Sequence, residues 1–304
     1  MRLALAGDTM LGRGVAERLE GMAPERLVSD AVAAAAREAD LFVLNLECCI
    51  SDRGSPWPDP LKPFFFRAPA KAVDLLRHLG VGCVTLANNH ALDFGEEALL
   101  DTLEHLAAAG IAWVGGGADL DAARAPAHAG GLAVVAFADH PQEYAAAPGR
   151  PGIALDGPWV EETIRALAGV TVLVTPHWGP NMAREPVARV RARAQPLLDA
   201  GATLVAGHSA HVFHGVEGRV LWDLGDFLDD YRVDPIARND LGLLWLVDLD
   251  ERRLEALPLK LDYCFTRLAD GEDAAWIRER FRRACADFGT EVREEGNRLI
   301  VDRA

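Results

Sequence analysis

The sequence predicts an α/β protein, because short apolar segments of strand length alternate with longer segments of helical periodicity along most of the chain. A second indication is that the apolar segments end in polar residues immediately before the next helical segment, as strands of open α/β sheets do. The apolar segments are 3–6, 41–44, 81–86, 111–114, 132–138, 170–175, 203–206 and 219–224. Residues 241–249 and 254–261 alternate apolar and polar positions and predict an antiparallel pair.

Helical periodicity follows several of these strands. The expected helices cover 24–39, a segment ending at Leu79-Gly80, 96–109, 184–200 and 273–288, and a polar strand closes the chain. Residues 51–63 and 141–157 are rich in Pro, Gly and small residues and predict long loops. Loops of this length near a site are often functional, and the second is a candidate lid.

The length of 304 residues and the absence of a linker-like segment predict one main domain. We expect this domain to cover residues 1–250. Residues 251–304 would form a short C-terminal appendage packed on the same domain.

Composition excludes several classes of function. The net charge of −15 argues against nucleic acid or an anionic membrane surface as the main partner. No apolar run reaches membrane-spanning length, and the N-terminus lacks a signal-peptide pattern. The five cysteines are odd in number and include no Cys-x-x-Cys, so neither a disulfide framework nor a zinc ribbon is indicated. We expect the adjacent Cys48 and Cys49 to be buried small residues and the protein to be reduced and cytoplasmic. An anionic substrate would then need a local positive centre, such as a metal ion.

The stretch from Thr85 to Gly95 combines a strand end with residues suited to chemistry. Asn89 offers a carbonyl oxygen to a metal, and His90 offers an imidazole to a proton. Asp93, three residues further on, could hold that imidazole in one tautomer. The alternative is a turn and helix cap, where Asn and Asp are also favoured.

Other strand ends add potential ligands. Asn45 and Glu47 follow one strand and share a side of it. Because parallel strands with right-handed crossovers end on the same side, we expect the polar ends to converge at one edge of a parallel sheet. The mixed oxygen and imidazole set suits Mn, Fe or Zn. The residues at these ends are Asp8, Glu47, Asn89, His90, His177, His208 and His211.

These motifs, in this order from residue 3 to about 228, resemble the CapA family, which is named for capsule and poly-γ-glutamate synthesis. That family is similar in fold to the calcineurin-like metallophosphoesterases. The matching residues are Gly7-Asp8, Asn45-Leu46-Glu47, Ala87-Asn88-Asn89-His90 with Asp93 and Gly95, His177-Trp178-Gly179, Gly207-His208 with His211, and Leu224-Gly225-Asp226-Phe227.

The resemblance implies a four-layer α/β/β/α sandwich that holds one or two divalent ions. It assigns metal ligation to Asp8, Glu47, Asn89, His177, His208 and His211. His90, oriented by Asp93, would face the substrate and protonate the leaving group or stabilise negative charge. The implied mechanism is attack by a metal-activated water, whose pKa falls towards about 7. Residues expected near the substrate or behind the ligands are Arg13, Asn45, Arg67, Asn88, Trp178, His214 and Asp226.

The chain departs from the family pattern at several positions. Met10 stands where phosphoesterases have a histidine, so a mononuclear or weakly dinuclear site is expected. Asp226 replaces the usual Asn, which favours a metal but disfavours an anionic substrate. The other departures are Asn181 for Glu, Ala210 for Pro and His214 for Gln.

Three functions follow from these observations. The first is a metal-dependent hydrolase acting on a phosphoester or a related anionic ester or amide. The second is a metal-assisted epimerase of a peptide or glutamyl substrate. The third is a non-catalytic poly-γ-glutamate biosynthesis or binding subunit. Across all three, the expected partner is a small-molecule, peptide or poly-glutamate-like substrate, with no nucleic acid and no membrane.

Overall fold

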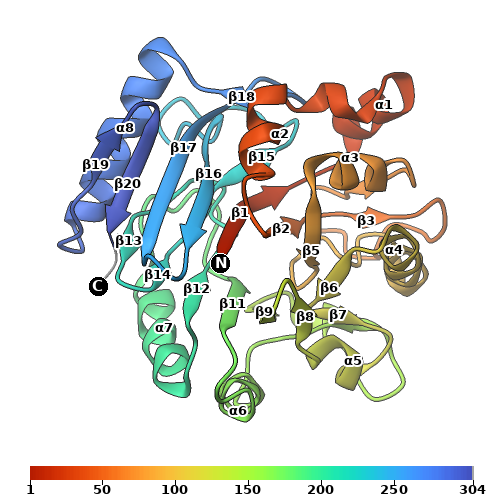
Figure 1. The fold of residues 1–304 in the computed structure, drawn as a ribbon. Coiled ribbons are helices and arrows are strands. Elements are labelled where there is room, and N and C mark those ends of the chain that lie inside the picture. Colours follow the sequence, from red (N-terminus) through yellow and green to blue (C-terminus); the bar gives the residue numbers. More distant parts are fainter. Residues whose placement is uncertain (303–304) are drawn as a thin grey trace.

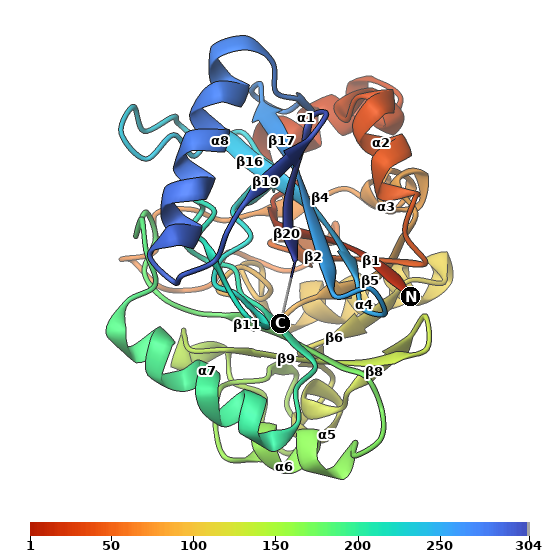
Figure 2. The same ribbon diagram turned by 60° about the vertical axis from the view of Figure 1, so that its left-hand side comes forward.

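The computed structural model describes residues 1–302, in which two β-sheets pack face to face between outer helices (Figures 1 and 2). Within these residues the larger sheet has ten strands. Their spatial order is β19 (Arg293–Glu295), β20 (Arg298–Asp302), β17 (Arg253–Leu261), β16 (Leu241–Asp248), β1 (Arg2–Thr9), β2 (Leu41–Leu46), β5 (Val81–Thr85) and β6 (Ala112–Val114), with β15 (Asp226–Leu228) beside β1 and β18 (Thr266–Leu268) beside β17.

The smaller sheet has six strands in the same described part of the chain. Its order is β13 (Val216–Glu217), β14 (Val220–Leu221), β12 (Leu204–Ala206), β11 (Val172–His177), β9 (Leu132–Ala138) and β8 (Ala127–Ala129). Two short pairs lie apart from both sheets. They are β3 (Cys49–Ile50) with β4 (Arg67–Ala68), and β7 (Gly116–Gly117) with β10 (Gly152–Ile153).

Helices cover the outer faces of both sheets. Against the larger sheet and its loops lie α1 (Arg13–Gly21), α2 (Asp30–Ala36), α3 (Ala72–Leu79) and α4 (Gly95–Ala109), with the 3₁₀ turn η1 (Pro24–Leu27). Against the smaller sheet lie α5 (Leu120–Arg124), α6 (Trp159–Ala166) and α7 (Ala188–Ala200), and η2 (Gln142–Tyr144) is in a loop. The last helix, α8 (Gly271–Ala286), packs on β16 and β17 from the side opposite α2 and also contacts β13 (Figure 2). The predicted four-layer fold class is confirmed.

Alternation along β9 shows how one strand serves two cores. Val134 and Ala136 face the core between the two sheets. Val135 and Phe137 face a separate core beneath the smaller sheet's helices. Because side chains of a strand point alternately to opposite faces, a continuous apolar run is required wherever both faces are covered.

Several predicted elements have different bounds in the structure. The first strand extends to Thr9 and therefore includes Asp8. The helix predicted over 24–39 is two pieces, because Val28 is extended and Ser29 starts a new helix by accepting a hydrogen bond from the Val32 amide. The helix predicted from residue 184 begins at Ala188, since the residue before a proline, here Glu185, disfavours helical backbone.

The C-terminal segment from residue 251 continues the larger sheet. β17 pairs with β16 along its length, and β20 pairs with β17 on the other side. All five cysteines are buried and unpaired, and burial was the prediction for Cys48 and Cys49. No helix within residues 1–302 has both the length and the apolar character needed to cross a membrane.

Candidate metal centre

Five of the six predicted ligands come together at the meeting point of two sheets. Asp8 lies near the end of β1 and Glu47 directly follows β2, both in the larger sheet. His177 ends β11 in the smaller sheet, and His208 and His211 follow β12. The expected convergence at one edge of a single sheet is therefore wrong, because the chain passes into a second sheet after β6.

Two hydrogen bonds position Asp8, one within the larger sheet and one from the loop that follows β12. The Asp8 amide donates to the Gly225 carbonyl at 3.0 Å, and the Ser209 amide donates to Asp8 Oδ2 at 3.2 Å. A Cβ at residue 7 would lie 1.9 Å from the Gly225 oxygen, so only glycine allows the first contact. Ser209 and His211 both have positive φ, at 120° and 60°, which indicates strained backbone where the histidines enter the site.

Two groups of potential ligand atoms share Asp8. One contains Asp8, His177 and His208, and the other contains Asp8, His211 and Asp226. Within each group the ligand atoms lie within 4.8 Å of one another. In the first, Nδ1 of His177 lies 2.8 Å from Nδ1 of His208. In the second, Nδ1 of His211 lies 3.3 Å from Asp8 Oδ2.

Glu47 lies beside the first group. Its Oε1 is 3.9 Å from Nε2 of His177, and its Oε2 accepts a hydrogen bond from the Tyr231 hydroxyl at 3.0 Å. Asp8 and Glu47 are both at most 1% exposed. The arrangement therefore places three carboxylates, of Asp8, Glu47 and Asp226, and three imidazoles in one buried cluster.

Buried polar residues orient these ligands from behind. The Asn45 amide donates to Asp8 Oδ1 at 2.7 Å, and its own oxygen accepts from Thr85 and Asn88 at 2.8 and 3.0 Å. Nε2 of His208 lies 3.0 Å from the Thr175 hydroxyl, so the other ring nitrogen faces the cluster. Such outer contacts fix ligand geometry in metal sites.

Unpaired oxygen atoms support a cation in this cluster. Two buried oxygens, Glu47 Oε1 and Asn89 Oδ1, receive no hydrogen bond from any described residue. A buried oxygen without a hydrogen bond lowers the stability of the folded protein, and a carboxylate in a low-dielectric interior needs a positive partner. Oxygen and imidazole donors suit a divalent ion of the Mn, Fe or Zn type. The residues present therefore fit the metal that the resemblance implies.

Burial and mutual repulsion shift the pKa values here. Burial, then the charge of Asp8, raises the pKa of Glu47 well above its usual value. Burial, then the charge of Asp229, does the same to the pKa of Asp226. Burial lowers the pKa of His208 to about 3. Burial also opposes the charged form of His211, but the charges of Glu47 and Asp8 outweigh it and raise its pKa.

His90 and Asp93 form the second predicted unit. Nδ1 of His90 lies 2.6 Å from Asp93 Oδ2, and the His90 ring stacks on Phe66 with centroids 4.0 Å apart. Burial outweighs the effect of Asp93 and lowers the pKa of His90 to about 4, so the imidazole is neutral near pH 7. With its Nδ1 proton held by Asp93, the ring presents Nε2 as an acceptor.

Sequence reasoning missed residues that complete this unit. Lys62 Nζ lies 3.0 Å from Asp93 Oδ1, and the Tyr144 hydroxyl donates to the same oxygen at 3.1 Å. Both lie in the long loops at 51–63 and 141–157, so loop length was the available signal. Tyr231, Asp223 and Asp229 were also missed, although they lie close to the Leu224-to-Phe227 motif in the chain.

Four other predicted residues make contacts outside the ligand cluster. Arg13 pairs with Asp230 and lies over the Phe66 ring. Arg67 lies over the Phe94 ring at 4.1 Å. The Trp178 indole donates a hydrogen bond to the Trp222 carbonyl, and the His214 ring contacts the Ala183 carbonyl.

The fold and site define a four-layer α/β/β/α protein with a buried carboxylate–histidine centre of metal-binding type. The chain belongs to the family of the bacterial capsule synthesis protein PGA_cap, whose family model matches residues 2–231. This confirms the resemblance seen in the sequence.

Two sequence relatives agree with that assignment. A probable polyglutamine synthesis accessory protein of Mycobacterium tuberculosis is 32% identical, and the match covers 97% of this chain and 94% of that protein. The PGA biosynthesis protein CapA of Bacillus subtilis is 27% identical over 75% of this chain and 63% of its own length. A crystal structure of the protein TT1561 of Thermus thermophilus covers 84% of this chain and 97% of its own, with 12% identity and a TM-score of 0.42.

Proposed function

We propose that this protein is a metal-dependent hydrolase of an anionic ester or amide, with one or two ions of the Mn, Fe or Zn type held by Asp8, Glu47, Asn89, His177, His208 and His211. The observation that supports this most is the contact of His90 with Asp93, next in the chain to Asn89, whose buried oxygen lacks a donor among the described residues. A bound divalent ion would supply an activated water and polarise the substrate oxygen.

The protein's own groups would then handle the proton. Nε2 of neutral His90 accepts a proton during attack and returns it to the leaving group. Asp93 stabilises the imidazolium that forms and fixes its orientation, while Lys62 and Tyr144 hold Asp93 in place. Phe66 covers one face of the ring, which excludes water from it.

The relatives' names narrow the candidate substrate. They refer to polyglutamine synthesis and PGA biosynthesis. We therefore propose a glutamyl amide as the leading substrate and a phosphoester as the second. The five buried, unpaired cysteines are consistent with a cytoplasmic setting.

The test is turnover by metal-loaded protein of aryl phosphate mono- and diesters and of a γ-glutamyl anilide. His90→Ala should lower turnover by about 100-fold or more while leaving the metal content unchanged. His128→Ala, which replaces an exposed histidine on β8, is the matched control and should behave like the wild type. Full metal content with no turnover of any substrate would contradict the proposal.

A second candidate is a non-catalytic role in polymer synthesis. It is favoured by the word "accessory" in the name of the Mycobacterium relative. Retention of poly-γ-glutamate by protein that turns over none of the substrates would support this role. Retention should then be independent of His90.

A further inference from the structure

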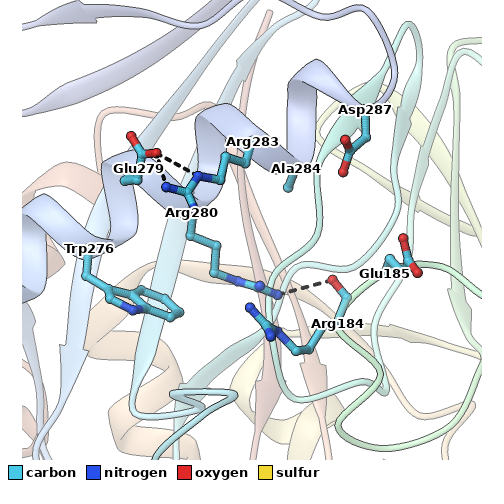
Figure 3. A pocket seen from close by; sticks show the side chains of 8 residues that line it. All are labelled: Arg184, Glu185, Trp276, Glu279, Arg280, Arg283, Ala284 and Asp287. Atoms are coloured by element: carbon cyan, nitrogen blue, oxygen red, sulfur yellow. Dashed lines mark hydrogen bonds and ion pairs between the residues drawn. The ribbon is translucent and has the colours of Figure 1, made fainter.

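A cavity of about 750 Å³ lies outside the metal centre, between α8 and the loop at residues 184–185 (Figure 3). Trp276, Arg280 and Arg283 line it from α8, and Arg184 lines it from the loop. The α8 side of the cavity lies beyond residues 2–231, which the family model matches.

Arg280 is held rigidly in this cavity. Its guanidinium lies over the Phe213 ring at 5.2 Å and the Trp276 ring at 5.7 Å. One terminal nitrogen donates to the carbonyl oxygens of Phe213 and Arg184, at 3.1 and 3.3 Å. Its Nε is buried and has no partner among the described residues. An arginine fixed by aromatic rings retains donors for a planar oxyanion at little further entropic cost.

The charged neighbour of Arg280 is another cation. Burial and the charge of Arg184 together lower the pKa of Arg280 to about 10. Neither arginine forms an ion pair with a carboxylate within residues 1–302, whereas Arg283 in the same cavity pairs with Glu279. In a chain of net charge −15, two adjacent guanidinium groups without a carboxylate between them are unusual.

We propose that Arg184 and Arg280 form an oxyanion-binding site in this cavity, with Trp276 as one wall. The ligand group is a carboxylate of an acidic peptide or a phosphate group. Guanidinium groups bind either through paired N–H donors, and a bound anion removes the repulsion between the two arginines. This site is independent of the proposed hydrolase activity.

The far side of the cavity limits what the site accepts. Glu185 and Asp287 lie on the side away from Trp276 (Figure 3). Their negative charges disfavour a second anionic group there. The site should therefore take one oxyanion of its ligand at the arginine pair.

The loop at 208–214 connects this site with the metal centre. Arg280 donates to the carbonyl of Phe213, two residues after His211. Arg280 thus contacts the same loop that supplies two candidate metal ligands. The two sites share one structural support without sharing residues.

The test is calorimetric titration of the metal-loaded chain with glutamate trimer and, separately, with inorganic phosphate. Arg184→Gln should weaken binding about tenfold or more, because Arg184 is exposed and its loss removes donors without disturbing the core. Arg280→Lys should weaken it similarly, since lysine lacks the planar fork. Arg283→Gln, which removes a paired arginine of the same cavity, is the matched control and should bind like the wild type.

Asn89→Ala separates binding at the metal centre from binding in the cavity, because binding in the cavity should persist in that variant. Binding of the trimer alone identifies a peptide carboxylate, and binding of phosphate alone identifies a phosphoryl group. Both outcomes support the site. Absence of binding by both probes, or binding that Arg184→Gln and Arg280→Lys leave unchanged, overturns the proposed site.

Arg184→Gln should retain wild-type turnover of aryl esters, so failure of this site and failure of the hydrolase are distinguishable.

Discussion

Nδ1 of His211 lies 2.8 Å from Oδ1 of Asp226 and 3.3 Å from Oδ2 of Asp8. The prediction from the sequence put Asp226 near the substrate or behind the ligands, and not among the metal ligands. Met10 occupies the position of a missing histidine, and its sulfur accepts from the Gly12 amide instead. We propose that Asp226 supplies a further ligand oxygen, beside Asp8 and His211.

Replacement of Asp226 by asparagine should raise the melting temperature of the metal-free protein and reduce the further rise that metal produces. Without metal, Asp226→Asn should raise the melting temperature, because it removes one of several mutually repelling buried carboxylates. With Mn present, the metal-induced rise in melting temperature should be smaller than in the wild type. Thermal denaturation with metal analysis measures both effects. Asp156→Asn, on the remote side of the smaller sheet, is the control, and an unchanged metal-induced rise in Asp226→Asn would refute the ligand role.

Asp93 should affect turnover without affecting metal content. Asp93→Asn weakens the contact that holds the Nδ1 proton of His90, so turnover should fall about 10- to 100-fold. Tyr144→Phe removes only one donor to Asp93 and should have a smaller effect. Steady-state kinetics with parallel metal analysis tests this. Equal turnover in Asp93→Asn and wild type would show that the pair is purely structural.

Gly7 should tolerate no side chain. In Gly7→Ala the added Cβ would lie 1.9 Å from the Gly225 oxygen, so β1 and β15 must separate. The free energy of unfolding should fall by about 3 kcal/mol, as measured by denaturant unfolding. Gly21→Ala is the control, because nothing lies within 4 Å of a Cβ at the end of α1, and it should stabilise by about 0.5–1 kcal/mol. Similar stability of the two variants would contradict the close approach.

Asp240 should make stability depend on pH. Burial alone would raise its pKa, but ion pairs with Arg238 and Lys260 outweigh burial and hold the pKa below its usual value. Ionised Asp240 therefore stabilises the folded protein above the unfolded-state pKa of about 4. This stabilisation is lost as the pH falls through the lower folded-state pKa.

Asp240→Asn should accordingly lower the free energy of unfolding by about 2 kcal/mol at pH 7. The difference from the wild type should shrink as the pH falls below about 4. Denaturant unfolding across this pH range provides the measurement. Asp262→Asn removes an exposed pair with Arg267 and should cost less than about 1 kcal/mol at any pH. A pH-independent deficit in Asp240→Asn would rule out the ionic origin.

The positions of the candidate ligands could be predicted because each lies close to a strand end that is visible in the apolar pattern. Asp8 and His177 lie within the last two residues of their strands, and Glu47 directly follows its strand. Side chains that approach from distant loops could not be found in this way. Lys62 and Tyr144 contact Asp93 only because two long loops fold over it.

The sequence by itself determined the alternation of strands and helices, the family, and the residue types at the strand ends, because these depend on local periodicity and short motifs. Only the tertiary structure decided that the ligands come from two sheets, that Asp226 faces His211, and that Arg184 and Arg280 lie together without a counter-ion among the described residues. These features depend on contacts between residues far apart in the chain, and local patterns do not specify how two sheets and a C-terminal helix pack against one another.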